Sequence, residues 1–330
     1  MATTADYLSQ LQADKQALVN NLVEKGVEAT SEETFTSLVP KVLDIQSDSG
    51  GIEDYFETTL GTSGTMTGYI KNIPPLDASA CTALNSFLFG YSSLNGNITI
   101  NTPNCTTFNS MFYGAFDTTN DHIVTMEDMS KGTSMSAMFE TSNVTDVIFN
   151  NTQNVTTMSA LFRDALRLKS ITGLDTSSCT DMNQMFYLNN NRNRPNLTEI
   201  PAMNTRKATN MNSMFYNCKN IITIPELNAE SCVNVTNMFF RCSGLVNFGG
   251  LKDLGKAYLT TVSANYSNYT LTLSNASNLT HDSLMNVING LYDIASLGVQ
   301  LQKLVLGSTN LAKLTEEEIA IATNKGWTVS

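Results

Sequence analysis

The stretch "CTDMNQMFY" at residues 179–187 decides the fold, because variants of it recur along much of the chain. Each variant contains an apolar pair, usually Met-Phe, and the first residue of that pair is used here as an anchor. The anchors are separated by 24, 27, 23, 24, 29 and 24 residues, and they are Phe87, Met111, Met138, Leu161, Met185, Met214 and Met238. This recurrence predicts a repeat protein in which each unit buries its apolar face against the next.

A second phrase lies between anchors. It occurs as "IPPLD" (73–77), "ITGLD" (171–175), "IPAMN" (200–204) and "IPELN" (224–228). Its alternating apolar residues predict a very short strand, and the strands must be parallel because each repeat returns in the same sense. Apolar residues three and four apart in the Met-Phe phrase predict a short helical turn. We therefore expect an α/β solenoid of about seven repeats.

Two steps between anchors are longer than the rest. The 27-residue step accommodates "AFDTTNDH" (115–122), and the 29-residue step accommodates "NNNRNR" (189–194). Insertions in repeat proteins usually form loops on one face. These two loops are therefore candidates for specificity.

Both phrases resemble the BspA-type leucine-rich repeats of bacterial surface proteins and bacteriophage tail proteins, over about residues 70–250. The resemblance implies a leucine-rich-repeat solenoid with short parallel strands. The N-terminal segment is similar to the helical segment that begins many phage tail or fibre-like proteins. We expect an N-terminal helical attachment segment (1–46), a linker (47–51), the solenoid (52–250) and a C-terminal α/β cap (251–330).

The N-terminal segment carries a narrow apolar stripe close to the spacing of a coiled coil, at Leu8, Leu11, Leu18 and Leu22. Gly26 should end this helix, and Thr30-x-x-Glu33 predicts the start of a second one. So small a segment cannot form a large core alone. We expect it to attach the chain to other virion proteins or to further copies, with a trimer assumed from fibre-like proteins. The alternative is a helical cap on the first repeat.

The residues beyond 250 lose the anchor pattern. Strands are predicted around 269–277 and 301–307, with a helix between them, and Thr315-x-x-Glu318 predicts the start of a last helix before a strand-like "WTVS". Solenoids need such an atypical terminal unit to close their exposed core.

The net charge of −11 lies mainly in residues 1–57, which hold 11 acidic and 3 basic residues. A chain without clustered Lys and Arg has no electrostatic surface for nucleic acid. No apolar run reaches the roughly 20 residues of a membrane span, and the start has no signal-peptide pattern. We therefore expect a protein made in the host cytoplasm and localised in the virion, without membrane insertion.

Catalysis is not expected, because His122 and His281 lie far apart in sequence and neither has a partner in a recognisable motif. No carboxylate pair stands out among the acidic residues, and neither a cofactor nor a metal is expected. The six cysteines occupy only two positions of the repeat, which predicts buried thiols rather than disulfides or ligands.

Binding is better supported by one column of positions, two residues after each anchor: Phe89, Tyr113, Glu140, Arg163, Tyr187, Tyr216 and Phe240. The column forms either the edge of the core or a row of partly exposed rings on which sugars lie. Residues 163–241 contain nine basic residues, Arg192 and Arg194 among them, and six acidic residues. They form either a contact surface for an anionic partner or simply solvated surface.

These features, with the resemblance, lead us to expect a phage virion protein that is not an enzyme and that recognises a host-surface glycan or protein. The expected ligand contacts are Tyr113, Arg163, Tyr187, Arg192, Arg194, Tyr216 and Phe240. The alternatives are a purely structural virion subunit and a bacterial surface adhesin.

Overall fold

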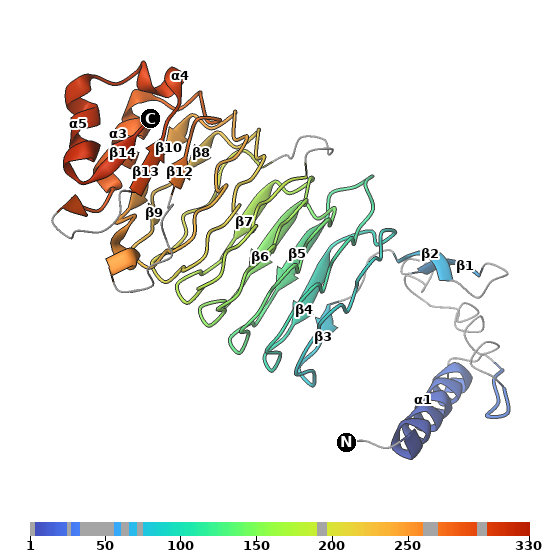
Figure 1. Ribbon diagram of the computed structural model, residues 1–330. Coiled ribbons are helices and arrows are strands. Elements are labelled where there is room, and N and C mark those ends of the chain that lie inside the picture. The colour runs from blue at the N-terminus through green and yellow to red at the C-terminus, as the bar shows by residue number, and fades with distance from the viewer. Residues whose placement is uncertain are drawn as a thin grey trace. The chain divides into compact units, whose positions relative to one another are not determined.

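The structure, a computed structural model, describes residues 4–24, 28–33, 56–60, 66–70, 75–189, 197–259, 270–295 and 302–330. The chain divides into two compact units, residues 1–73 and residues 74–330 (Figure 1). The predicted linker at 47–51 and the body of the second N-terminal helix lie outside the described residues. So do Arg192 and Arg194.

The first unit contains helix α1 (Thr4–Glu24) and an antiparallel pair of strands, β1 (Phe56–Leu60) and β2 (Met66–Ile70). The helix agrees with the predicted one. Its residues Val19 and Leu22 are buried, and Leu18 packs against them. The side chains of Leu8 and Leu11 lie outside the described residues, so their role in assembly stays a prediction.

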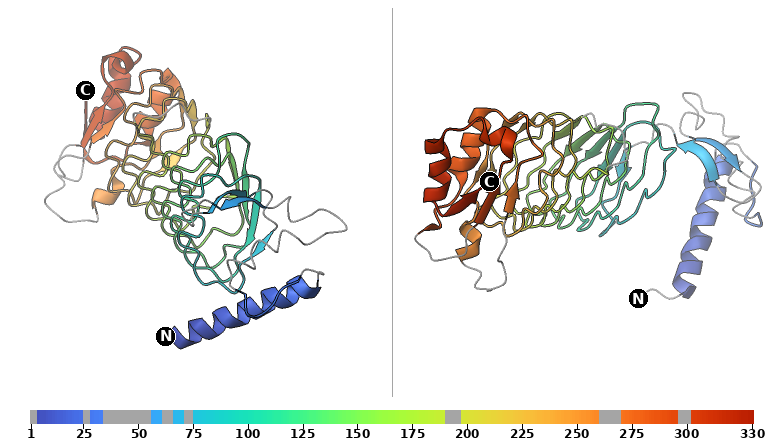
Figure 2. Two further views of the ribbon diagram at one scale, coloured as in Figure 1. Left: turned by 90° about the vertical axis from the view of Figure 1, so that its right-hand side faces the viewer. Right: turned by 45° about the horizontal axis from the view of Figure 1, so that its top comes forward.

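The second unit is a stack of coils with short parallel strands, best followed in Figures 1 and 2. Five strands pair in chain order, one from each successive coil. They are β3 (Leu76–Asp77), β4 (Ile98–Asn101), β5 (Ile123–Met126), β6 (Asp146–Phe149) and β7 (Ser170–Thr172). Inward residues such as Val124, Met126 and Val147 are buried, which explains the predicted alternation.

After β7 the strands continue as shorter parallel pairs. A bridge joins Glu199 to Thr223, and β10 pairs with β8 while β11 pairs with β9. Their bounds are β8 (Thr223–Ile224), β9 (Leu227–Asn228), β10 (Asn247–Phe248) and β11 (Leu251–Lys252). Apart from Asn189, the insertion predicted at 189–194 from the 29-residue step lies outside the described residues.

The Met-Phe phrase forms a series of tight turns, so the predicted helical turn is wrong. The residue before every anchor has a φ between 52° and 55°, at Ser86, Ser110, Ala137, Ala160, Gln184, Ser213 and Asn237. A right-handed helix cannot continue through this left-handed conformation. The amide of the positive-φ residue and the amide two residues later donate instead to the neighbouring coil, as when Ser110 N–H donates to the Ser136 carbonyl at 2.9 Å and Phe112 N–H to the Met138 carbonyl at 2.8 Å.

The core of the stack is a ladder of phenylalanines, the second residue of each Met-Phe pair. Their rings stack on one another with centroid distances between 5.1 and 5.7 Å, along Phe112, Phe139, Phe162, Phe186, Phe215 and Phe239. All six are buried. Stacked rings at this spacing add attraction beyond the burial of apolar area.

The C-terminal region agrees with the predicted α/β cap. A parallel sheet runs in the order β12 (Thr270–Thr272), β13 (Gln302–Val305) and β14 (Trp327–Val329). The helical segments are η2 (Lys256–Leu259), α3 (His281–Gly290), α4 (Ser308–Leu311) and α5 (Glu316–Asn324). Thr315 and Glu318 form the predicted capping box of α5. Leu284, Val287 and Ile288 of α3 are buried.

Candidate functional site

The predicted column contains two groups of stacked rings at the surface of the stack. Phe89 stacks on Tyr113 with ring centroids 4.6 Å apart, Tyr187 on Tyr216 at 4.6 Å, and Tyr216 on Phe240 at 4.9 Å. Phe89 is 50% exposed and the other rings are half-buried. The column therefore lies at the boundary of core and surface, outside the phenylalanine ladder.

The rings of the column stack face to face, so their faces are covered by neighbouring groups. Tyr216 has a ring on each face, and Tyr187 has Tyr216 on one face and the Arg163 guanidinium over its ring, 5.2 Å from its centroid. A sugar that stacks on an aromatic ring needs an open ring face. A sugar therefore cannot stack on Tyr187 or Tyr216. What the column offers along its length is ring edges and tyrosine hydroxyls.

The column is interrupted by a charged pair. Arg163 Nε lies 3.6 Å from Glu140 Oε1, and Arg163 Nη1 donates to Gln184 Oε1 at 3.3 Å. Burial raises the pKa of Glu140, and this outweighs the opposing effect of Arg163. Arg163 is thus held by the chain itself, with its plane over Tyr187.

Of the nine basic residues between 163 and 241, seven lie in the described part of the chain, and four of these seven form ion pairs. Arg167 and Lys169 contact Asp121 at 3.6 and 2.6 Å. Arg206 contacts Glu230 at 2.6 Å, and Lys256 contacts the same carboxylate at 3.6 Å. The Lys169 ammonium lowers the pKa of Asp121. These pairs neutralise much of the charge, so an anionic polymer gains little from the described part of this surface.

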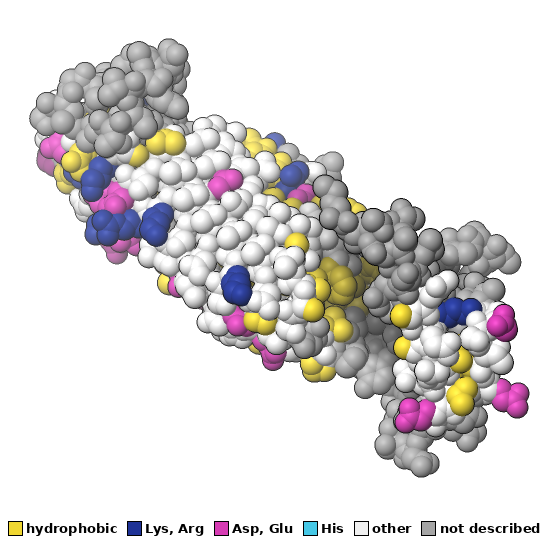
Figure 3. All heavy atoms as spheres, turned by 90° about the horizontal axis from the view of Figure 1, so that it is seen from below, with side chains coloured by type: hydrophobic (Ala, Val, Ile, Leu, Met, Phe, Trp, Pro, Cys, Tyr) yellow, Lys and Arg dark blue, Asp and Glu magenta, His cyan; other side chains and the backbone are white. Residues whose placement is uncertain are grey.

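An exposed threonine ladder runs along the stack. Each hydroxyl donates to the carbonyl of the equivalent residue one coil earlier, at 3.0 to 3.2 Å, at Thr106, Thr133, Thr156, Thr180 and Thr209. All five are exposed. Because each hydroxyl group donates its hydrogen to a carbonyl of the neighbouring coil, its oxygen can still accept a hydrogen bond from a ligand. Figure 3 shows a face of the stack on which uncharged side chains and backbone make up most of the described surface.

The cysteines are free thiols, and five of the six are buried, as predicted. Burial raises the pKa of Cys105 to about 11 and that of Cys179 to about 12. It also raises the pKa of Cys242 to about 12, and that of Cys218 well above its usual value. The thiolate is the reactive form, so these four thiols are poor nucleophiles.

Thiol labelling should therefore distinguish one cysteine from the rest. We expect iodoacetamide at about pH 8 to modify Cys81, which is partly exposed, and to leave the five buried thiols intact while the chain is folded. Intact-mass measurement should show one adduct under native conditions and six in denaturant. Two or more rapid adducts on the folded chain would contradict the packing described here.

A buried ionisable pair was missed by the sequence analysis. His122 is fully buried, and its Nε2 lies 3.2 Å from Asp117 Oδ1. Both residues belong to the insertion at 115–122, and the carboxylate also accepts from Thr119 and Asn120. The presence of an acid and a histidine five residues apart in one insertion was the available signal. The other histidine, His281, contacts Glu318 at 2.8 Å in the cap.

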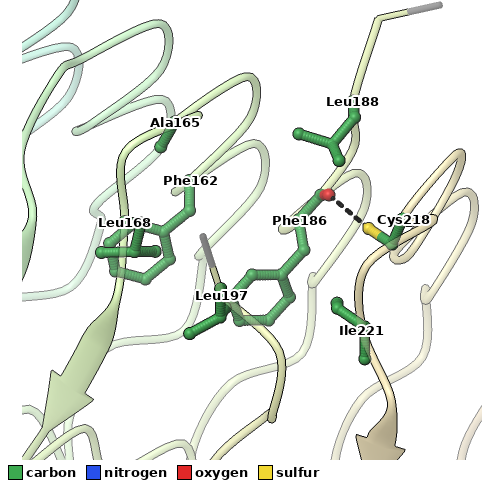
Figure 4. A pocket seen from close by; sticks show the side chains of 8 residues that line it. All are labelled: Phe162, Ala165, Leu168, Phe186, Leu188, Leu197, Cys218 and Ile221. Carbon is green, nitrogen blue, oxygen red and sulfur yellow. Dashed lines mark hydrogen bonds between the residues drawn. The ribbon is translucent and has the colours of Figure 1, made fainter. Parts of the chain in front are cut away.

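A small apolar depression, with a cavity volume of only about 20 Å³, opens between coils (Figure 4). Its lining is Phe162, Ala165, Leu168, Phe186, Leu188, Leu197, Cys218 and Ile221. The Cys218 thiol donates to the Phe186 carbonyl at 3.0 Å, so even this polar group is turned to the backbone. The depression lacks the convergent polar groups that orient a substrate.

Within the described residues, no three His, Cys, Asp or Glu side chains gather closely enough to hold a metal ion. No helix in that part of the chain is both long and apolar enough to cross a membrane.

The second unit defines a mixed α/β protein with short parallel strands and stacked repeats. The chain belongs to the family described as "Mycoplasma protein of unknown function, DUF285", whose model matches residues 63–148 and 133–247. This membership supports the expected BspA-like repeat protein. Comparisons with curated proteins and with solved structures gave no match.

Proposed function

We propose that this chain is a leucine-rich-repeat solenoid of a bacteriophage virion that binds a glycan on the host surface without chemical turnover. The N-terminal helical segment attaches it to other virion proteins. The observation that carries the proposal is the column of half-buried aromatic residues, in which Tyr187 and Tyr216 stack on one another in successive coils. The proposed location in a virion rests on the resemblance to phage tail proteins.

The tyrosine hydroxyls are suited to sugars. Those of Tyr113, Tyr187 and Tyr216 make no hydrogen bond to any residue that the structure describes. A phenolic hydroxyl both donates and accepts, and the exposed threonine ladder adds acceptors. An uncharged array of donors and acceptors repeated at the coil spacing matches a neutral polysaccharide, whose hydroxyls also repeat along the chain.

Hydroxyl removal tests this contact without disturbing the ring stack. We expect the double variant Tyr187→Phe/Tyr216→Phe to bind the glycan about thirtyfold more weakly, because two lost hydrogen bonds at roughly 1 kcal/mol each total about 2 kcal/mol. The measurement is binding of the purified full chain to arrayed bacterial polysaccharides and to whole host cells. Tyr292→Phe, which removes a hydroxyl from the cap, is the matched control and should bind like the native chain.

Two results would count against the proposal. Absence of native-chain binding to every polysaccharide and cell tested would leave the purely structural role, for which the paired surface charges are suited. Equal binding by the native chain and the double variant would place the glycan elsewhere. A bacterial surface adhesin would bind in the same assay but would be found on cells rather than in virions.

A further inference from the structure

The first coil of the second unit presents an aromatic end. Phe87, Phe89 and Tyr91 are 46%, 50% and 48% exposed. In the second coil, the anchor Met111 is fully buried and Tyr113 is covered by Phe89. Soluble proteins rarely leave several neighbouring large apolar side chains exposed without use.

The same end presents backbone acceptors without partners. At the first junction of the stack, the amides of Leu84, Ser86, Leu88 and Gly90 donate to the carbonyls of Thr107, Asn109, Met111 and Tyr113 at 2.7 to 2.9 Å. The equivalent carbonyls of the first coil accept no hydrogen bond from a described residue; they are those of Ala83, Asn85, Phe87 and Phe89. A ligand for this end must therefore supply donors.

The amides next to the exposed rings of the first coil are already used. The amides of Phe87 and Phe89 donate to Leu84 and Ser86 within their own coil. A second copy placed end to end would bring acceptors against acceptors. A cation with several N–H groups and no acceptor is the complementary ligand, and the guanidinium group of arginine has five such donors.

The column itself shows how such a cation sits. Arg163 lies over Tyr187 at 5.2 Å, and Arg241 lies over Phe240 at 5.3 Å, so both ends of the Tyr187–Tyr216–Phe240 stack carry a guanidinium. Phe89 has Tyr113 on one face, and its other face makes no ring contact with a described residue. The outer face of Phe89 therefore has no guanidinium group over it from any described residue, in contrast to Tyr187 and Phe240.

We propose that this end of the stack binds an arginine side chain of a partner protein. Its guanidinium lies on the outer face of Phe89 and donates to the carbonyls of Phe87 and Phe89. Residues 1–73 cannot supply it, because they contain no arginine.

The arginines described in a second copy are already engaged. Arg167 contacts Asp121, Arg206 contacts Glu230, and Arg163 and Arg241 lie over their own rings. This favours a different protein over self-association. The inference is independent of glycan binding, because it concerns the end of the stack and not the length of the column.

The test uses acetyl-arginine amide as the probe and saturation-transfer NMR on the full chain. We expect binding of this probe, and binding about fivefold weaker for Phe89→Leu, which keeps apolar bulk but removes the ring face. Phe89→Tyr keeps the face and should bind like the native chain. Ile222→Ala, a change at a 45% exposed side chain elsewhere in the stack, should also leave binding unchanged.

The contrary results are equally specific. Equal saturation transfer to acetyl-lysine amide or to the neutral acetyl-citrulline amide would overturn the guanidinium assignment. Unchanged arginine binding in Phe89→Leu would overturn the site. Concentration-dependent self-association that Phe89→Leu abolishes, measured by sedimentation, would show that the occupant is a second copy.

Discussion

Replacement of Phe139 by alanine is expected to lower the free energy of unfolding of the repeat stack by about 3–5 kcal/mol. Phe139 is fully buried and stacks on Phe112 at 5.1 Å and on Phe162 at 5.6 Å. It also meets Phe149 edge-on at 6.2 Å. Removal of the ring leaves a cavity bordered by three other rings.

The surrounding coils cannot close that cavity. The amide of Phe139 donates to the Leu161 carbonyl at 2.9 Å, and the amide of Phe112 donates to the Met138 carbonyl at 2.8 Å. These bonds hold the coil spacing, so the neighbours relax only partly and the cavity cost is retained. Because each coil contacts mainly its neighbours, the variant should also unfold less cooperatively.

Urea unfolding followed by circular dichroism measures both effects. Ile222→Ala is the control, since Ile222 is 45% exposed and its truncation should cost well under 1 kcal/mol. Similar losses in the two variants would mean that the phenylalanine ladder does not stabilise the stack as argued.

The stacking order was predictable because the period places equivalent residues of successive coils above one another. It placed Phe139 and Glu140 in two different columns, but whether the column of Glu140 was core or surface was left open by the sequence. The turn conformation was not predictable, because residues such as Ala137 and Gln184 give no glycine-like signal for a positive φ. Their conformation is imposed by hydrogen bonds to the neighbouring coils.

The members of the candidate site were predictable, but their mode of contact was not. The repeat spacing in the sequence predicts that Tyr187 and Tyr216 lie in the same column. Only the structure shows that the two rings cover one another's faces, with centroids 4.6 Å apart. The ion pairs of Arg167 and Lys169 with Asp121 join residues at least 46 positions apart, from 121 to 167. Pairing across coils at such separations requires the geometry of the insertion, which has no equivalent in other repeats.

Replacement of Asp117 by asparagine is expected to destabilise the stack by about 2–4 kcal/mol near neutral pH. Asp117 is 8% exposed, and its Oδ1 accepts from Thr119, Asn120 and His122. Its buried Oδ2 has no hydrogen-bond partner among the described residues. An amide loses the charge that strengthens the Oδ1 contacts, and its NH2 group finds no acceptor at the Oδ2 position.

The same carboxylate makes stability depend on pH. Burial raises the pKa of Asp117, but the hydrogen bonds from Thr119, Asn120 and His122 together lower it below the usual 3.8. A carboxyl group whose pKa is lower in the folded state stabilises the fold above its ordinary pKa. That contribution is lost as the pH falls from about 4 through the folded value.

Asp121→Asn is the matched control, because Asp121 lies in the same insertion but its side chain is 59% exposed. Its pair with Lys169 is solvent-exposed, so we expect a loss of less than about 1 kcal/mol. Urea unfolding from about pH 7 down to pH 3 should show a smaller pH dependence for Asp117→Asn than for the Asp121→Asn chain, because the former lacks the buried carboxyl group. Equal stabilities and equal pH slopes for the two variants would show that the buried Asp117–His122 pair does not hold the insertion. Only the buried carboxylate combines four donor contacts with an unpartnered oxygen, and this difference from Asp121 is what the comparison isolates.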